Sequence, residues 1–369
     1  MPSLSNLLPA ARTLINKHSQ EAGVSFFLIL TVIASIRFFS GLDTVVYQCD
    51  EYSYLRKSYF LDLYLEGKFS DPQWQSGDAT DQTKLMEYLY GLPASLLYGK
   101  SFIALAQEDS QRFGESYLNY GDWAASYGQP ATNLKISPRL RQVLLGGRMI
   151  AATFTVLYVL LATFSLYWLF RGSVILSGLG FVFFITHPIV AIHGRQILAD
   201  SALNTFFVLG LLIQLLWWQA LGKSSQPNRK LLGLAAVLGV VGGLAAAAKF
   251  NGFMHLMLTE VLIGIGMVFK VRQDRKARRL WLRYLGLSAL VCAGVTFLVF
   301  FALHPNTWAS PVEKLQEFYD WRWSLTQYYQ GYFPEDSVNF WPQRLQFILL
   351  RTAGFMPGVG SIGFHWESR

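Results

Sequence analysis

Two acidic residues, Asp50 and Glu51, directly follow the first long apolar stretch of the chain. A carboxylate that is partly withdrawn from water has a raised pKa and can take a proton from a hydroxyl or an amine. The pair is therefore a candidate for acid–base chemistry. A second interpretation stays open, in which the two carboxylates only cap the amino end of a helix and interact with its dipole.

Three cations, Lys84, Arg195 and Lys249, also fall near the ends of apolar segments. Positive charge at such places can stabilise a leaving phosphate, or it can only anchor the chain to lipid headgroups. Asp200 could orient Arg195, bind a metal or position an acceptor, and it could also cap the helix that starts at Ser201.

Other polar residues leave several interpretations open. His187, His193 and His304 match no ligand spacing, so a metal site stays unknown and a divalent cation is only an option for the carboxylates. Arg37 and Arg148 lie within apolar stretches and could bind phosphate or pair with a carboxylate in the bundle. Aromatic residues late in the chain suit a membrane interface or stacking on a sugar ring, and they are Trp308, Trp321, Trp323, Tyr328, Tyr329 and Trp341.

The elements that carry these residues are predicted from composition. The chain has 369 residues, of which 52% are hydrophobic and only 15% charged. Soluble domains carry about 25% charged residues, and here the apolar residues form blocks long enough to cross a bilayer. The net charge of +8 comes largely from short loops between those blocks, so it predicts membrane topology and no nucleic-acid partner.

The blocks predict an all-α polytopic membrane protein with about seven transmembrane helices. Residues 1–23 are expected to form a cytoplasmic amino terminus, and residues 24–303 a membrane module that contains all the spans. Residues 304–369 are expected to be the start of a second large outer loop. The expected spans are 24–42, 143–170, 174–192, 201–221, two within 231–269 that turn at 249–252, and 284–303.

The first outer loop, residues 43–141, is expected to contain interfacial helices. The spacing of apolar residues predicts an amphipathic helix over 52–67. Residues 85–98 are apolar but too short to span, so they are expected to lie in the interface. Residues 104–136 are predicted to be a loop.

Basic residues predict the orientation. With the amino terminus in the cytoplasm, thirteen Lys and Arg residues lie at cytoplasmic span ends, and the short outer connectors hold two, Arg195 and Lys249. The same topology puts all the candidate site residues on the outer face: Asp50, Glu51, Lys84, Arg195, Asp200, Lys249, Asn251 and His304. Charge at membrane depth commonly marks function.

Six segments, in this order, resemble the protein O-mannosyltransferase and aminoarabinose-transferase group of GT-C glycosyltransferases. They are "YQCDEYSYLRKSYF", "DQTKLMEYLYGL", "LGGRMIAATFTVLYVLL", "HPIVAIHGRQILADSALNTFF", "GLAAAAKFNGF" and "HPNTWASPVEKLQEFYDWR". The resemblance covers residues 41–323. It leaves two interpretations of the chain's end open, a fragment of a longer protein or a compact member of the group.

The resemblance implies roles for particular residues. Asp50 would be the catalytic base and Glu51 its neighbour in acceptor or metal binding. Lys84 would contact the phosphate of the donor, and Arg195 and Asp200 would belong to the same site. Lys249, Asn251 and His304 fall in matching segments and are expected to bind substrate.

The implied activity is transfer of a sugar, with inversion, from a polyprenyl-phosphate donor to a protein, lipid or glycan acceptor. The site would face away from the cytoplasm, in a bacterial inner membrane or, in a eukaryote, the endoplasmic reticulum. Two other classes of function stay open for this chain. One is a transporter or flippase of lipid-linked glycans, for which paired broken helices and repeated halves would be expected. The other is a noncatalytic scaffold relative.

Overall fold

The structure is a computed structural model that describes residues 23–332. The chain divides into two compact units, residues 1–308 and residues 309–369. Within residues 23–332 the chain forms helices and no β-strand, apart from an isolated bridge between Val46 and Pro130. The predicted all-α class is therefore confirmed for the described residues.

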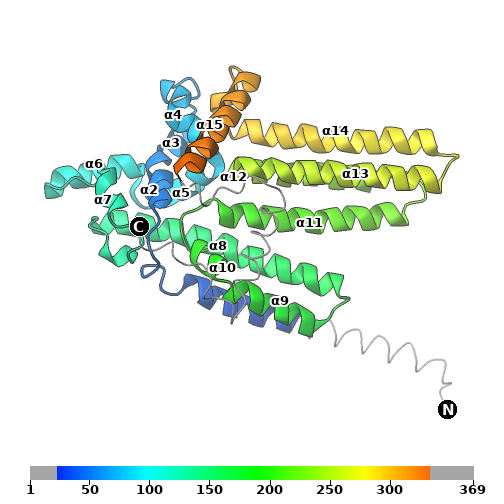
Figure 1. Cartoon of the computed structure of the whole chain (residues 1–369), viewed down its shortest axis with the longest axis horizontal. Coiled ribbons are helices and arrows are strands. Elements are labelled where there is room, and N and C mark those ends of the chain that lie inside the picture. The colour runs from blue at the N-terminus through cyan, green and yellow to red at the C-terminus, as the bar shows by residue number, and fades with distance from the viewer. Residues whose placement is uncertain (1–22, 333–369) are drawn as a thin grey trace, which may run out of the picture. The chain divides into compact units, whose positions relative to one another are not determined.

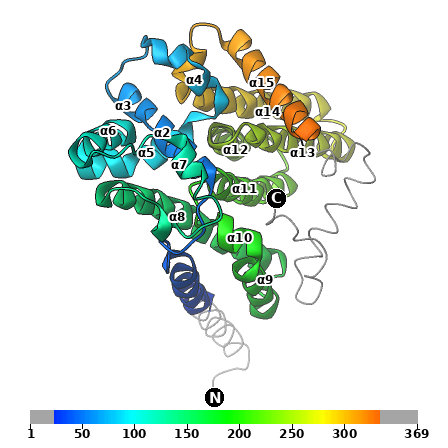
Figure 2. The same cartoon turned by 60° about the vertical axis from the view of Figure 1, so that its left-hand side comes forward.

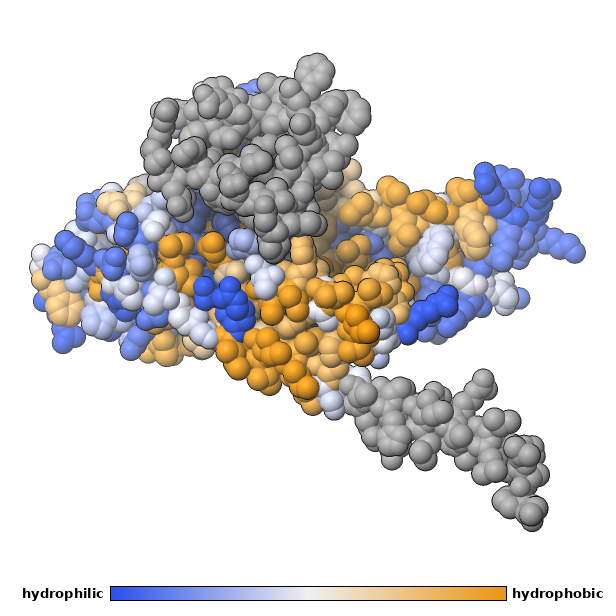
Figure 3. All heavy atoms as spheres, turned by 60° about the horizontal axis from the view of Figure 1, so that its bottom comes forward, coloured by the Kyte–Doolittle hydropathy of each residue, from blue (hydrophilic) through white to orange (hydrophobic). Residues whose placement is uncertain are grey.

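Five helices of the first unit are long and apolar enough to cross a membrane. They lie side by side along one direction (Figure 1), which is the arrangement expected for a polytopic membrane protein. Their bounds are α8 (Pro138–Leu169), α11 (Asp200–Lys223), α12 (Arg229–Ala248), α13 (Phe253–Gln273) with the short helix η3 (Phe250–Gly252) before it, and α14 (Arg278–Ala302). Figure 3 shows apolar side chains over the middle of one face and hydrophilic ones toward its ends.

Two shorter apolar helices accompany the five, over Gly23–Phe39 and α9 (Val174–Thr186). The predicted single span over 174–192 is wrong, because α9 ends before His187 and a separate helix, α10, covers Pro188–His193. A residue that precedes proline is pushed out of helical geometry, and His187 has a ψ of 122°. The structure thus supports a polytopic protein, while the count of seven crossings stays a prediction.

The turn predicted at residues 249–252 is confirmed. Helix α12 ends at Ala248, and the short helix η3 leads directly into α13. The turn is tight, because a Cβ atom on Gly252 would lie 2.1 Å from the carbonyl carbon of Ala245. Glycine alone fits this close approach. Lys249 is thereby held at the same end of the bundle as the start of α11.

Six short helices cluster at one end of the long helices (Figures 1 and 2). They are α2 (Cys49–Lys57), α3 (Tyr59–Leu65), α4 (Gly77–Asp81), α5 (Lys84–Tyr98), α6 (Phe102–Phe113) and α7 (Tyr120–Ala124), with short 3-10 helices η1 (Pro72–Gln75) and η2 (Ala131–Asn133). The predicted helix over 52–67 is found as α2 and α3, which break at Ser58. Helix α5 is not among the candidate spans, in agreement with the prediction for 85–98.

The prediction of a loop over 104–136 is wrong in its first part, where α6 lies. The sequence does contain local signals for this helix, at its two ends and along one face. Ser101 caps the helix through its side chain, and Gly114 ends it in a left-handed conformation. Phe102, Leu105 and Asp109 follow at intervals of three and four residues and are buried on one face.

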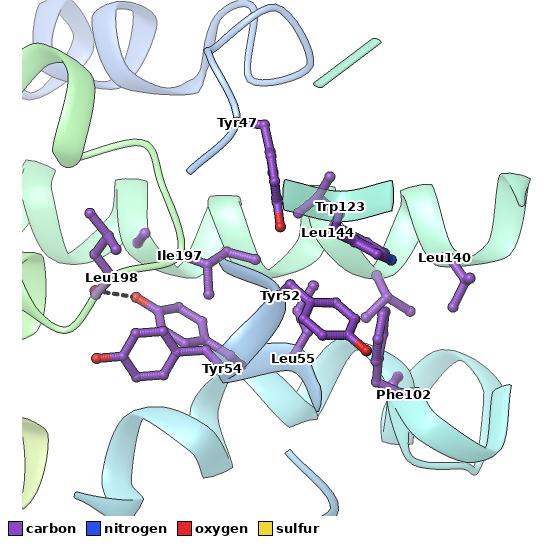
Figure 4. Close-up of a cluster of buried hydrophobic side chains, with 14 of the residues drawn as sticks. Tyr47, Tyr52, Tyr54, Leu55, Phe102, Trp123, Leu140, Leu144, Ile197 and Leu198 are labelled. Carbon is purple, nitrogen blue, oxygen red and sulfur yellow. Dashed lines mark hydrogen bonds between the residues drawn. The ribbon is translucent and has the colours of Figure 1, made fainter. Parts of the chain in front are cut away.

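Helix α2 is held in place by a large aromatic cluster. Tyr52 and Leu55 on α2 face Leu144 of α8 and Phe102 of α6 (Figure 4). The ring of Tyr52 also lies 5.0 Å, centroid to centroid, from that of Trp123 on α7. Aromatic pairs at such distances add to the stabilisation from burial alone. This packing fixes the helix whose first turn contains Asp50 and Glu51.

Four side chains bond to the last carbonyls of α14 and to that of Leu303 just after it, where the regular hydrogen bonding of the helix ends. His304 and Trp308, just beyond the helix, donate to the carbonyls of Phe300 at 2.7 Å and Phe301 at 2.6 Å. Tyr64 of α3 donates to Ala302 at 3.1 Å, and Tyr88 of α5 donates to Leu303 at 2.9 Å. The short helices are therefore fastened to the last long helix of the first unit. The short helix η4 (Pro305–Thr307) follows it.

The second unit is described over one helix, α15 (Pro311–Tyr332). The predicted outer loop over 304–369 therefore contains a long helix. Trp321, Trp323 and Tyr328 lie on it, and the side chain of Tyr329 is not described. Trp341 and residues 1–22 of the amino terminus predicted for 1–23 lie outside the described residues.

Helices α12 and α14 pack through glycines, which gives a first prediction. A Cβ on Gly239 would lie 2.6 Å from the carbonyl oxygen of Cys292, whereas Gly294 on α14 has open space around it. Small residues let transmembrane helices approach this closely. We expect Gly239→Val to lower the melting temperature of the purified protein in detergent by several degrees, and Gly294→Val to leave it nearly unchanged. Equal melting temperatures for the two variants would contradict this packing.

Candidate functional site

All eight candidate residues lie at the end of the first unit where the short helices gather (Figure 2). Each one falls at the end of an element: at the start of α2, α5 and α11, or just after α10, α12 and α14. Their side chains fall into two groups. Some are buried and fully engaged with protein, and others reach water. The residues are Asp50, Glu51, Lys84, Arg195, Asp200, Lys249, Asn251 and His304.

Glu51 belongs to the buried group. Its side chain and that of Arg148 are both 0% exposed and form a two-pronged ion pair, with N–O distances of 2.7 and 2.9 Å. The same carboxylate accepts from the backbone N–H groups of Gln48 and Ile197, each at 3.1 Å. No oxygen of Glu51 is left for a substrate, so the geometry favours a positioning role over the acceptor or metal contact that the resemblance implies. Of the two roles open for Arg148, the structure shows carboxylate pairing.

Lys84 is buried as well. Its ammonium group is 2.7 Å from the carboxylate of Glu87 and 3.1 Å from the carbonyl oxygen of Asp78. Burial outweighs the nearby ammonium and raises the pKa of Glu87 to about 7. Because the Lys84 side chain is 0% exposed, the geometry does not favour the contact with a donor phosphate that the resemblance implies.

His304 holds α5 to the end of α14. Its Nε2 accepts from the backbone N–H of Lys84 at 3.1 Å, while Nδ1 donates to the carbonyl of Phe300. Complete burial lowers the pKa of His304 to about 3, so the ring is neutral at physiological pH and keeps these two roles. The arrangement is structural and leaves the imidazole without access to a substrate.

Asp50, in contrast, has an exposed side chain and lies between two ion pairs. One pair joins Lys57 of α2 with Asp81 of α4, and the other joins Lys249 with Asp200 at 2.7 Å. The pKa of Asp50 is raised, mainly by partial desolvation and next by the charge of Asp81, while Lys249 and Lys57 oppose the shift. A water-accessible carboxyl with a raised pKa is suited to accept a proton.

Lys57 and Asp81 were not predicted as site residues. Lys57 follows Asp50 by seven residues, which is two helical turns, so the two side chains share a face of α2. That spacing was a usable signal. Asp81 comes from α4, 31 positions along the chain from Asp50, and nothing in the sequence places α4 against α2.

Arg195 and Arg37 form a second charged feature nearby. The guanidinium of Arg195 donates to the carbonyls of Ala191 at 3.0 Å and Ser40 at 2.9 Å. Burial lowers the pKa of Arg195, and the nearby positive charges of Arg37 and Arg148 lower it further. Within residues 23–332, neither Arg195 nor Arg37 forms an ion pair with a carboxylate. The positive charge there is suited to bind an anion.

Asn251 is exposed in the turn after α12, and the described contacts do not join its side chain to the other candidates. The same residues, 23–332, contain no cluster of three or more His, Cys, Asp or Glu side chains arranged to hold a metal ion. A divalent cation stays an untested prediction.

Comparisons with known proteins identify no family for this chain. No protein-family model matches the chain, and no curated protein matches it either.

The buried ion pair gives a second prediction. Removing one partner of such a pair costs about 3–5 kcal/mol, because the other charge is left buried and unpaired. We expect Arg148→Leu to lose about this much stability, measured by chemical denaturation in detergent, and the double variant with Glu51→Leu to lose less than the two single variants together. The matched control is Lys100→Met, which removes an exposed ion pair with Glu108 and should change stability little. Strict additivity of the two single variants would contradict the pairing.

Proposed function

We propose that this protein is a membrane glycosyltransferase. It transfers a sugar from a polyprenyl-phosphate-linked donor to an acceptor hydroxyl or amine at the end of the bundle that bears α2–α7. The observation that carries the proposal is Asp50, an accessible carboxyl with a raised pKa that lies among charged residues from α2, α4, α11 and the turn after α12. The resemblance of the six sequence segments quoted above to GT-C glycosyltransferases supports the same assignment.

The reaction needs a base and a place for negative charge. Asp50 takes the proton of the acceptor group, whose oxygen or nitrogen attacks the anomeric carbon of the sugar. The bond between that carbon and the phosphate oxygen breaks, and the lipid phosphate leaves with the electron pair. Attack in line with the leaving group inverts the configuration of the sugar.

Arg195 and Arg37 are the cations we assign to the lipid phosphate. They replace Lys84 in this role, because Lys84 is buried and neutralised by Glu87. Guanidinium groups bind phosphate through paired hydrogen bonds, and positive charge near the leaving oxygen stabilises the transition state. Lys249 supplies further positive charge and is itself held by Asp200.

A donor attached to a polyprenyl lipid fits the position of the site. The lipid would remain in the bilayer beside the apolar helices while its phosphate and sugar reach the bundle end. In the proposed topology this end faces away from the cytoplasm, in a bacterial inner membrane or in the lumen of the endoplasmic reticulum. The acceptor would be a protein, a lipid or a glycan.

The direct test uses radiolabelled polyprenyl-phosphate sugars with the protein in vesicles. Asp50→Asn should reduce transfer by about 10²–10⁴-fold, the usual contribution of a general base, without changing the melting temperature. The matched control is Asp122→Asn, which alters an exposed aspartate on α7 and should transfer normally. Label that crosses the membrane without reaching any acceptor would point to a transporter, and normal turnover by Asp50→Asn would refute the base assignment.

The surroundings of Asp50 also predict its pH dependence. The negative charge of Asp81 raises the pKa of Asp50. Removing that charge also frees Lys57 from its ion pair with Asp81, and the positive charge of Lys57 lowers the pKa of Asp50. The base works only when deprotonated, so Asp81→Asn should shift the acidic limb of the kcat/KM profile to lower pH. Asp81→Glu keeps the negative charge and should shift the acidic limb of the profile less. An acidic limb that moves to higher pH in Asp81→Asn would contradict this electrostatic arrangement.

A further inference from the structure

A pocket of about 300 Å³ lies between α8, α10 and α11, next to the charged residues around Asp50. Its volume is at the lower end of the range for small-molecule sites, which is about 300–1,000 Å³. Asp200 connects the two features, because it lines the pocket and also pairs with Lys249. The lining includes Tyr158, Ile189, His193, Asp200, Ser201 and Asn204.

The chemistry of the lining favours an uncharged ligand with hydroxyl groups. No lysine or arginine is among the described residues that line the pocket, and one carboxylate is, so an anion is disfavoured. The side chains of Tyr158, His193 and Asn204 have no hydrogen-bond partner within residues 23–332. Together they offer donors and acceptors. Ile189 adds an apolar wall.

Contacts within the protein hold the wall of the pocket between α8 and the turn after α10. Thr155 of α8 donates to the carbonyl of Gly194 at 2.8 Å, which ties the turn after α10 to α8. A Cβ on Gly194 would lie 2.4 Å from the carbonyl oxygen of Val190 and 2.6 Å from the methyl group of Thr155. Glycine is therefore required for this contact. A preformed pocket loses little conformational freedom when it binds a ligand.

We propose that this pocket binds the sugar ring of the donor. Asp200 and Asn204 would hydrogen-bond the ring hydroxyls, and Ile189 and Val190 would contact the apolar C–H face of the ring. A lipid chain would need an apolar lining throughout, which the pocket lacks, and a phosphate would need cations. The inference rests on the proposed function, since it assigns a part of the donor to a part of the same site.

The experiment measures binding by the purified full-length protein in nanodiscs. The probes are bare polyprenyl phosphate and the polyprenyl-phosphate derivatives of mannose, glucose, galactose and aminoarabinose. We expect the wild-type protein to bind at least one sugar derivative at least tenfold more tightly than the bare lipid phosphate. Asn204→Leu, which replaces the amide with a bulkier apolar side chain, and His193→Ala should remove that preference and leave the affinity for bare lipid phosphate unchanged.

The control is Leu211→Ala, on the lipid-exposed side of α11, which should keep the preference. Folding of each variant is checked by its melting temperature. The inference is overturned if Asn204→Leu and His193→Ala retain the preference, or if they lose affinity for bare lipid phosphate as strongly as for the sugar derivative. A wild-type protein that shows no preference and no transfer with any of the sugars would instead overturn the proposed function, and the sugar pocket with it.

Discussion

The buried ion pair between Glu51 and Arg148 is the constraint on which the rest of the site depends. Both charges have left water, which is expensive, and the loss is offset only because every polar atom of the carboxylate has a partner. The pair joins α2 to α8 and to the segment at Ile197. Since Asp50 is the neighbouring residue in the first turn of α2, its position is set by a contact that it does not make itself.

The titratable side chains at this end of the bundle separate into two kinds by their access to water. Glu51, Lys84 and His304 are enclosed and hold helices together, whereas Asp50, Asp200 and Lys249 remain accessible. The sequence does not distinguish these six residues, because each is a polar residue near the end of an apolar block. Burial, and not residue type, decides which of them can meet a substrate.

The sequence predicted much of the fold because the bilayer restricts it. Long apolar blocks have to be helices in a membrane, so α8, α11, α12, α13 and α14 were all expected, and so was the turn at Lys249. Outside the bilayer no such restriction applies, and α6 was predicted as a loop. The spacing of Lys84 and Glu87, three residues apart on α5, shows that the two side chains can pair. No pattern along the sequence shows that His304, 220 residues away, packs against Lys84 and helps to bury it.

The hydrogen bonds at the end of α14 have a consequence for how the protein is made. Tyr64 and Tyr88 are synthesised more than 200 residues before the carbonyls of Ala302 and Leu303 to which they donate. During translation α3 and α5 can therefore form these two hydrogen bonds only after the end of α14 has been synthesised. A ribosome that stalls before residue 303 would leave α3 and α5 without their anchor, so the assembly of the site is a late event in biogenesis.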